Sequence, residues 1–484
     1  MEHFVATVAL IGIVIVVASL LSGVIERIGI PLVGVFLLLG AALGPFGFGL
    51  TDIQLDSPEL VVLATLGLAL VLFSDAVGVD IRELRERRRL AWIILGPGTI
   101  FPALLIALAA YWLLDVPPAG AAILGAALAS TDPVLLRSVL RSPSLAPTAR
   151  VALRLESGMN DVVLLPVVVI GILALRQNTP LAGQDLGRHL VGLFILGPSL
   201  GALIGWFGIT ILAAVRDRAG VRRDYESLYA LGLGFAAYAA AEAVGGSGFL
   251  AAFAAGLAIA ALDVELCDCF LEYGEATAEM LLLLTFVAFG TSLIWTGFSV
   301  ADVRTLSFAA VALGVRTVVL YPVLAYAGVR GDDRKLIAWF GPRGLSSLLL
   351  ALLPVFAGVT DSTRWFTITC LVVLLSLLVH GSVIGVFLRR RATAVRAPLR
   401  AAIPTADAAR AQDARLPERI TIEEVRALQQ QAGPIVFVDA RAPRSYNADP
   451  RQITGSVRIP PDDPVRAATE QRLSQHATLV VYCA

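Results

Sequence analysis

The sequence predicts an all-α polytopic membrane protein of about thirteen transmembrane helices, followed by a small α/β tail. Three observations support this fold class: 57% of the 484 residues are hydrophobic, only 16% are charged, and the mean hydropathy is +0.79. Soluble domains average about 25% charged residues, so the composition excludes a soluble enzyme over most of the length. The 38 acidic residues balance the 38 basic ones, and without a basic excess we expect no nucleic-acid partner.

A helix that crosses a bilayer needs about 20 mostly apolar residues, and the sequence contains thirteen such windows. The first window has neither a basic leader nor a small-residue cleavage site, so we interpret it as a retained helix and not as a signal peptide. Only the short run 245–248 separates the eighth window from the ninth. The windows are 4–24, 31–50, 59–79, 90–114, 118–140, 151–175, 188–215, 227–245, 247–262, 277–297, 304–329, 336–357 and 365–389.

Arginine-rich linkers follow the third, fifth, seventh and thirteenth windows, whereas linkers such as 51–58 and 115–118 carry no arginine. Positively charged residues stay on the cytoplasmic side of a membrane. Thirteen spans therefore predict a multi-pass protein of the cell (inner or plasma) membrane, with its N-terminus outside and its C-terminus in the cytoplasm. The acidic linker 263–275 gives this orientation no support. The arginines are Arg82, Arg85, Arg87, Arg88, Arg89, Arg137, Arg141, Arg150, Arg154, Arg216, Arg218, Arg222, Arg223, Arg389, Arg390 and Arg391.

The fifth window contains Ser130-Thr131-Asp132-Pro133 near its middle. Pro133 removes a backbone donor and disfavours helical angles at Asp132, so we expect the helix to break there. A membrane tolerates such a break only where it is buried in protein or lines a cavity. The alternative is a plain proline kink in which Asp132 caps the following half-helix.

The sixth window contains two carboxylates, Glu156 and Asp161. At about 100° per residue, Glu156 and Asn160 share one stripe of the helix, and Ser157 and Asp161 share the adjacent stripe. An ionised side chain at the bilayer centre costs about 2.5–3.5 kcal/mol or more, so at least one carboxylate needs a partner or water. Glu156 escapes this cost if the helix starts later, but Asp161 does not, because apolar sequence continues from Val162.

The eleventh window carries Arg316 with apolar sequence on both sides. An arginine in that position is expected to pair with an acid, and Glu156 and Asp161 are the natural candidates. Breaking such a buried pair costs about 3–5 kcal/mol. Snorkelling of Arg316 to an interface is the alternative.

The twelfth window contains Gly341-Pro342-Arg343-Gly344 and is a second interrupted span. It lies seven windows after the fifth, so the two spans run in opposite directions. Interrupted helices at matching places in two inverted repeats are the best sequence indication of a secondary transporter site. Asp132 and Arg343 could each neutralise the end of one half-helix.

Three other polar residues stand in or near apolar windows. Asp75 and Glu242 lie near window ends, and we expect them to be interfacial or paired. His380 lies near the end of the last window, and we expect a structural role for it and not that of a proton carrier.

Together these segments resemble the bacterial NhaP/NHE-type sodium/proton exchangers of the monovalent cation:proton antiporter superfamily. The resemblance covers about residues 5–392 and includes Gly274–Gly290. It implies a thirteen-helix fold with a core of two inverted six-helix bundles and a dimerisation domain, and hence a homodimer. The residues that carry it, in their order and spacing, are Thr131-Asp132-Pro133, Glu156-Ser157, Asn160-Asp161, Arg316 and Gly341-Pro342-Arg343-Gly344.

The resemblance also implies roles for these residues. Asp161 would carry either the cation or protons, and Thr131 and Ser157 would help to ligate the cation. Glu156 would pair with Arg316.

Two further positions bear on the transport cycle. Asn160 stands where some relatives have a second aspartate, which implies electroneutral exchange, and we group it with the structural pair of Glu156 and Arg316. The pair Gly158-Met159 departs from the bulky pair common in the family, which leaves room around the site.

The chemistry of the residues agrees with this resemblance. Hard cations prefer oxygen ligands, and Asp161, Ser157, Thr131, Asp132 and freed carbonyls offer them. Burial favours a protonated carboxyl, whereas a nearby cation favours the ionised form. We therefore expect Na⁺ (or Li⁺ or K⁺) and H⁺ to compete for Asp161 in an alternating-access antiporter that serves pH homeostasis. Its partners are these ions and membrane lipid, and we expect no cofactor and no enzymatic activity.

We divide the chain into a membrane domain (1–391), a linker (392–416) rich in alanine, arginine and proline, and a tail (417–484). In the tail we expect a helix over Thr421–Gln431 and buried strands over Ile435–Val438 and Leu479–Tyr482.

The tail resembles the first half of a rhodanese-like domain, from Val438-Asp439-Ala440-Arg441 through Tyr446 to Ile453-Thr454-Gly455-Ser456. The nucleophilic cysteine of that family falls on Cys483. Because the sequence ends at Ala484, the loop that would lower the pKa of the thiol is missing. We therefore expect that the chain has no sulfurtransferase activity and that Cys483 is an exposed thiol at a frayed chain end.

The two alternatives to an antiporter are a membrane-anchored enzyme or sensor and a cation channel. A membrane-anchored rhodanese-like sulfurtransferase or sensor would not need thirteen spans with buried charges. A channel-like cation pore predicts a polar helix face or a carbonyl filter motif, and the sequence contains neither.

Overall fold

The computed structural model separates into two compact units, Met1–Ala394 and Val395–Ala484. The first unit is helical and the second contains a small sheet. The residues that the structure describes are 12–17, 20, 32–140, 145–176, 183–219, 221, 223–262, 268–329, 331–402, 425, 435–441, 446, 451–459, 467–468, 471, 473 and 478–482.

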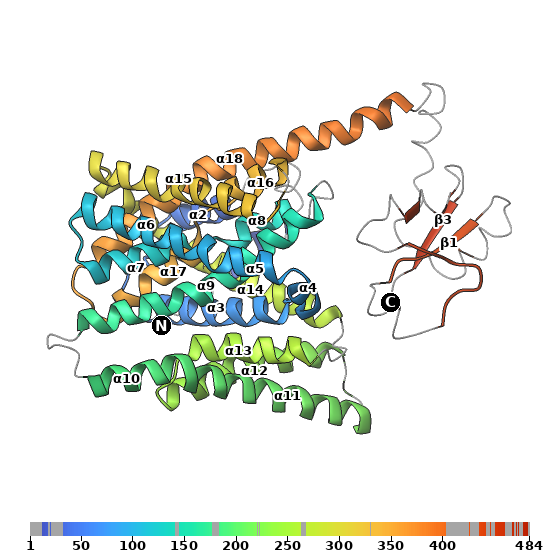
Figure 1. The fold of residues 1–484 in the computed structure, drawn as a ribbon, viewed down its shortest axis with the longest axis horizontal. Coiled ribbons are helices and arrows are strands. Elements are labelled where there is room, and N and C mark those ends of the chain that lie inside the picture. The colour runs from blue at the N-terminus through green and yellow to red at the C-terminus, as the bar shows by residue number, and fades with distance from the viewer. Residues whose placement is uncertain are drawn as a thin grey trace. The chain divides into compact units, whose positions relative to one another are not determined.

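The first unit is a bundle of helices (Figure 1). From residue 32 onward the helices begin with α2 (Leu32–Leu43), α3 (Pro58–Val77), α4 (Ile81–Glu86), α5 (Arg88–Leu95), α6 (Pro97–Leu114), α7 (Pro118–Ala129) and α8 (Pro133–Leu140). Next come α9 (Pro147–Arg176), α10 (Gly183–Val191), the π-helical η1 (Gly192–Leu196), α11 (Gly197–Ala219), α12 (Arg223–Ala243) and α13 (Gly248–Ala261). The last are α14 (Asp268–Thr291), the 3₁₀-helical η2 (Leu293–Val300), α15 (Val303–Tyr326), α16 (Gly331–Trp339), α17 (Leu345–Phe356) and α18 (Ser362–Ala402).

Among the described residues, seven helices are long and apolar enough to cross a membrane. The number is eight if the bent pair Met280–Thr291 and Leu293–Val300 forms one span. These spans and four shorter apolar helices coincide with the second to thirteenth predicted windows. The first window lies mostly outside the described residues, so thirteen spans remain a prediction. The four shorter helices are Leu32–Leu43, Leu228–Ala243, Gly248–Ala261 and Leu345–Phe356.

The eighth and ninth windows form two separate helices, α12 and α13, which lie with α11 along one flank of the unit next to α3 (Figure 1). Close packing between α11 and α13 depends on glycine. A Cβ on Gly201 or Gly205 would overlap the backbone of Ala251 or Ala255. Small residues four apart let helix backbones approach closely where lipid provides no hydrophobic driving force.

The last helix, α18, continues to Ala402, so the first part of the predicted linker is helical. The remainder of that linker, residues 403–416, lies outside the described part of the chain. Near its N-terminal end α18 contributes the buried aromatic residues Trp365 and Phe366, and Phe366 packs against Phe289 of α14.

The described residues of the second unit form three parallel strands in the order β2-β1-β3: β1 (Ile435–Asp439), β2 (Val457–Arg458) and β3 (Thr478–Tyr482). Val438 lies opposite Val457 on one side and Val481 on the other. The two predicted strands are therefore confirmed and pair directly. The prediction that both are buried is wrong for β3, where Leu479 and Val481 are 46% and 59% exposed, because β3 pairs on one side only, with β1, among the described residues. The predicted helix Thr421–Gln431 lies outside the described residues except for position 425, and Cys483 also lies outside them.

Candidate functional site

Both predicted interruptions are present in the structure. The fifth window breaks between α7 and α8, where Ser130 has extended backbone angles (φ −60°, ψ 139°). The twelfth window breaks between α16 and α17, over residues 340–344. The two breaks touch, because the Asp132 N–H donates to the Pro342 carbonyl at 3.0 Å. Unwound backbone is thus placed next to unwound backbone in the interior of the bundle.

The Asp132 carboxylate caps two half-helices at once. Its Oδ1 accepts from the N–H groups of Val134 (2.7 Å) and Leu135 (3.3 Å), at the start of α8. Its Oδ2 accepts from the N–H of Leu345 (2.5 Å), at the start of α17. Asp132 is only 1% exposed, so these amides take the place of water and complement the positive ends of both helices. A Cβ at Gly344 would overlap this carboxylate, and the contact therefore requires glycine.

Arg343 binds the carbonyl end of α7, whereas Asp132 binds the amide ends of α8 and α17. Its Nη1 donates to the carbonyls of Ala129 (2.8 Å) and Ser130 (3.0 Å), which end that half-helix. The Ser347 hydroxyl also donates to the Ser130 carbonyl, at 3.4 Å. Arg343 is 1% exposed, and its charge complements the negative end of α7.

Asp161 lies on α9 at this crossing and is 3% exposed. Its Oδ1 accepts a short hydrogen bond from the Ser130 hydroxyl, at 2.5 Å. The Ser346 hydroxyl on α17 and the Asp132 carboxylate also interact with it. Asp161 is thus surrounded by groups from both interrupted helices, and its hydrogen-bonding neighbours are hydroxyls.

Glu156 and Arg316 form a bidentate ion pair. Arg316 Nε and Nη2 donate to the two carboxylate oxygens of Glu156, each at 2.6 Å, and the side chains are 4% and 3% exposed for Glu156 and Arg316. Arg316 Nη1 also donates to the Ala338 carbonyl of α16 at 2.7 Å, and the Thr131 hydroxyl donates to Glu156 at 3.3 Å. This charge-assisted pair links α9, α15 and both broken spans. Snorkelling of Arg316 is excluded by its burial.

Asn160 does not join this ion pair, which corrects the grouping expected from sequence. It is 1% exposed, and neither atom of its carboxamide has a hydrogen-bond partner among the described residues. Glu156 instead accepts from Arg316 and from the Thr131 hydroxyl, and Arg316 also donates to the Ala338 carbonyl. A buried polar side chain without a partner is costly, so Asn160 is an energetically unfavourable position of this bundle among the described residues. Ser157, three residues earlier, is also buried, at 3% exposure.

Several residues at the crossing were not recognised from sequence. Ser130 and Ser346 contact Asp161, and no sequence signal separates them from other intramembrane serines. Asp75 of α3 lies against α9, because a Cβ on Gly158 would be 3.6 Å from the Asp75 carboxyl carbon. Its acidic character within an apolar window was the available signal. Glu242 instead caps α13 by accepting from the Gly248 N–H at 2.8 Å, which is a structural role.

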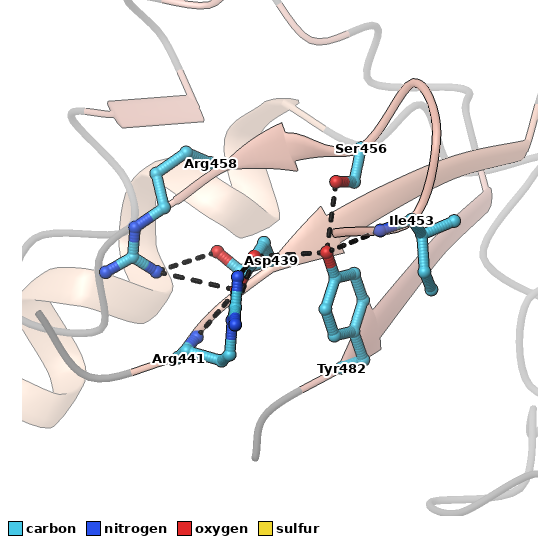
Figure 2. A network of polar contacts seen from close by, with 6 residues as sticks. All are labelled: Asp439, Arg441, Ile453, Ser456, Arg458 and Tyr482. Carbon is cyan, nitrogen blue, oxygen red and sulfur yellow. Dashed lines mark hydrogen bonds and ion pairs between the residues drawn. The ribbon is translucent and has the colours of Figure 1, made fainter. Parts of the chain in front are cut away.

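The tail contains its own polar network, centred on Asp439 at the end of β1 (Figure 2). Arg441 donates to both Asp439 oxygens, from Nε at 3.0 and 3.1 Å and from Nη2 at 2.7 Å. The Tyr482 hydroxyl donates to Asp439 at 3.0 Å and Arg458 donates to the Asp439 carbonyl at 2.9 Å. The hydrogen bonds from Arg441 lower the pKa of Asp439 to about 2. The network joins the ends of all three strands.

Comparison with known proteins gives consistent results. Residues 13–390 match the family described as sodium/hydrogen exchanger, transmembrane. The K⁺/H⁺ antiporter NhaP2 of Shewanella baltica is 28% identical over 382 residues, which cover 77% of this chain and 65% of that protein. The Na⁺/H⁺ antiporter NhaP of Pseudomonas aeruginosa is 27% identical over 392 residues, 74% of this chain and 88% of that protein. This chain thus spans about two thirds of the length of its Shewanella relatives.

Among solved structures, the sodium proton antiporter MjNhaP1 from Methanocaldococcus jannaschii superposes with a TM-score of 0.63. The match covers 80% of this chain and 98% of that one, at 21% sequence identity. At this identity the likeness establishes a shared fold. The relatives named here are transporters and not enzymes.

Proposed function

Because the chain belongs to the sodium/hydrogen exchanger family, we propose that it exchanges a monovalent cation, Na⁺ or K⁺, for protons across a membrane. Cation and proton compete for Asp161. The observation that carries this proposal is the position of Asp161: a buried carboxylate at the crossing of two interrupted helices, hydrogen-bonded to the Ser130 hydroxyl.

The groups around Asp161 suit a hard monovalent cation. Hydroxyl and carbonyl oxygens are ligands of such ions, and Ser130 and Ser346 supply hydroxyls beside the carboxylate. We place Thr131 and Ser157 in the same ligand set, with Asp132 as a contributor from its remaining lone pairs.

The charges at the crossing favour electroneutral exchange of one cation for one proton. Glu156 is neutralised by Arg316, and Asp132 is held by three backbone amides. Asp161 is bonded instead to a hydroxyl, which can turn its oxygen toward a cation or its proton toward a bare carboxylate. A single carboxylate that must be occupied by either ion, and that faces each side of the membrane in turn, is sufficient for coupled exchange by alternating access.

We further propose that the protein works as a homodimer in the cell membrane, with the cytoplasmic C-terminus that the arginine distribution predicts. For the tail we propose a rhodanese-like α/β unit, which is supported by its parallel β2-β1-β3 sheet.

The test is proton movement in vesicles that carry the full chain and an internal pH dye. Pulses of Na⁺, Li⁺ and K⁺ in turn should produce saturable alkalinisation with wild type and none with Asp161→Asn. The matched control is Asp115→Asn, which removes an exposed carboxylate paired with Arg304 and should transport normally. Cation-dependent proton movement by Asp161→Asn at the wild-type rate would show that the assignment is wrong.

A further inference from the structure

A serine and a histidine of α18 hold the second helix interruption in place. The Arg343 N–H, in the unwound segment 340–344, donates to the Ser376 hydroxyl oxygen at 2.7 Å. Ser376 Oγ lies 3.1 Å from His380 Nδ1. Ser376 is 0% exposed and His380 is 3% exposed. His380 therefore lies inside the bundle beside the helix break.

His380 also contacts the other side of the same interruption. Its ring lies 5.8 Å from the ring of Trp339, the last residue of α16, with an angle of 45° between the planes. Together, Ser376 and His380 contact the end of α16 and the middle of the unwound segment.

The Ser376 hydroxyl bonds differently from other hydroxyls on α18. The hydroxyls of Thr369 and Ser382 donate to carbonyls one turn back, those of Trp365 and Leu378. Among the described residues, Ser376 makes no such bond. Its oxygen accepts from the Arg343 N–H. The 3.1 Å contact between Ser376 Oγ and His380 Nδ1 fits either tautomer. We assign the imidazole proton to Nε2, so that the Ser376 hydroxyl donates to Nδ1.

We propose that Ser376 and His380 are positioning residues that set the affinity of the cation site. This inference rests on the proposed function. A chain of contacts joins them to Asp161: Ser376 fixes the backbone of Arg343, Arg343 binds the Ala129 and Ser130 carbonyls, and the Ser130 hydroxyl contacts Asp161. Neither residue touches the cation. Their effect is to keep the ligands of α7 at the distance that the ion requires.

The experiment measures KM and kcat for cation-driven proton movement by the full chain in proteoliposomes. Ser376→Ala leaves the Arg343 amide without an acceptor, and His380→Leu leaves the hydroxyl without one. Both variants should raise KM about tenfold with a smaller change in kcat. Ser376→Thr keeps the hydroxyl and His380→Asn places a carboxamide oxygen near the position of Nδ1, so each should stay within about threefold of wild type.

The matched control is Thr369→Val, which removes a buried hydroxyl of the same helix that is bonded to the Trp365 carbonyl. It should leave KM unchanged. Equal KM values for Ser376→Ala and Thr369→Val overturn the proposal, as do equal values for His380→Leu and His380→Asn. If Ser376→Ala does not fold, the two isosteric His380 variants decide alone. Failure of the proposed function is seen separately, as persisting exchange by Asp161→Asn.

Discussion

Removing one charge of the buried pair between Glu156 and Arg316 should destabilise the membrane unit strongly. Glu156→Gln keeps the shape of the side chain but leaves Arg316 without its counter-charge at 3% exposure. An uncompensated buried charge costs about 3–5 kcal/mol. At about 2 °C per kcal/mol for a unit of this size, Tm should fall by about 6–10 °C.

The exposed pair of Arg304 and Asp115 provides a matched comparison. Its charged atoms are 3.1 Å apart, but its side chains are 71% and 78% exposed. Exposed pairs contribute about 0–1 kcal/mol, so Asp115→Asn should change Tm by about 2 °C or less. The two variants remove the same kind of charge and differ in burial.

The assay is thermal unfolding of the detergent-solubilised full chain, followed by the loss of monodisperse protein. The double variant Glu156→Met with Arg316→Met removes both charges and should be more stable than Glu156→Gln alone. The Ala338 carbonyl keeps a donor in that variant, because the Thr317 hydroxyl also donates to it at 3.1 Å. A Tm for Glu156→Gln within 2 °C of wild type, or a double variant less stable than the single one, would refute the reasoning.

Two further predictions follow from the helix crossing and from the tail. Gly344→Ala should abolish cation-driven proton movement because its Cβ overlaps the Asp132 carboxylate, whereas Gly314→Ala, where a Cβ meets no atom within 4 Å, should transport as wild type; an active Gly344→Ala would contradict the geometry. In the full chain, Asp439→Asn should lower the hydrogen-exchange protection of β1 about tenfold at pH 7. The hydrogen bonds from Arg441 lower the pKa of Asp439 to about 2. The ionised carboxylate therefore stabilises the folded tail fully above the ordinary aspartate pKa of about 4, and this stabilisation is lost as the pH falls toward 2. At that pH the hydrogen-exchange protection of wild type and variant should converge. A difference that is the same at pH 2 and pH 7 would exclude a role for the ionised carboxylate.

Local sequence was sufficient to predict the second to thirteenth apolar helices, both interruptions and the strands of the tail. Apolar runs specify spans because a bilayer leaves the backbone no other partner than itself. Pro133 specifies a break because it lacks an N–H. The pairing of Arg316 with an acid was predictable as well, since a lone charge in apolar surroundings requires one.

The choice between partners was not contained in local sequence. Both Glu156 and Asp161 were candidates for Arg316, and only the packing of α15 against α16, and of α16 against α9, places Glu156 in bidentate reach. The same holds for the second helix that Asp132 caps. Its carboxylate accepts from the N–H of Leu345, which lies more than two hundred positions later in the chain.

The sequence alone therefore determined where the described apolar helices lie, where two of them break and which charges they carry, because these follow from the cost of polar groups in lipid. The tertiary structure decided which charge each residue meets. It showed that Asn160 stands apart from the ion pair and that His380 lies beside a helix break and not at a membrane surface. Hydrogen bonds act over about 3 Å, so residues far apart in the chain acquire their roles only when the helices that carry them cross.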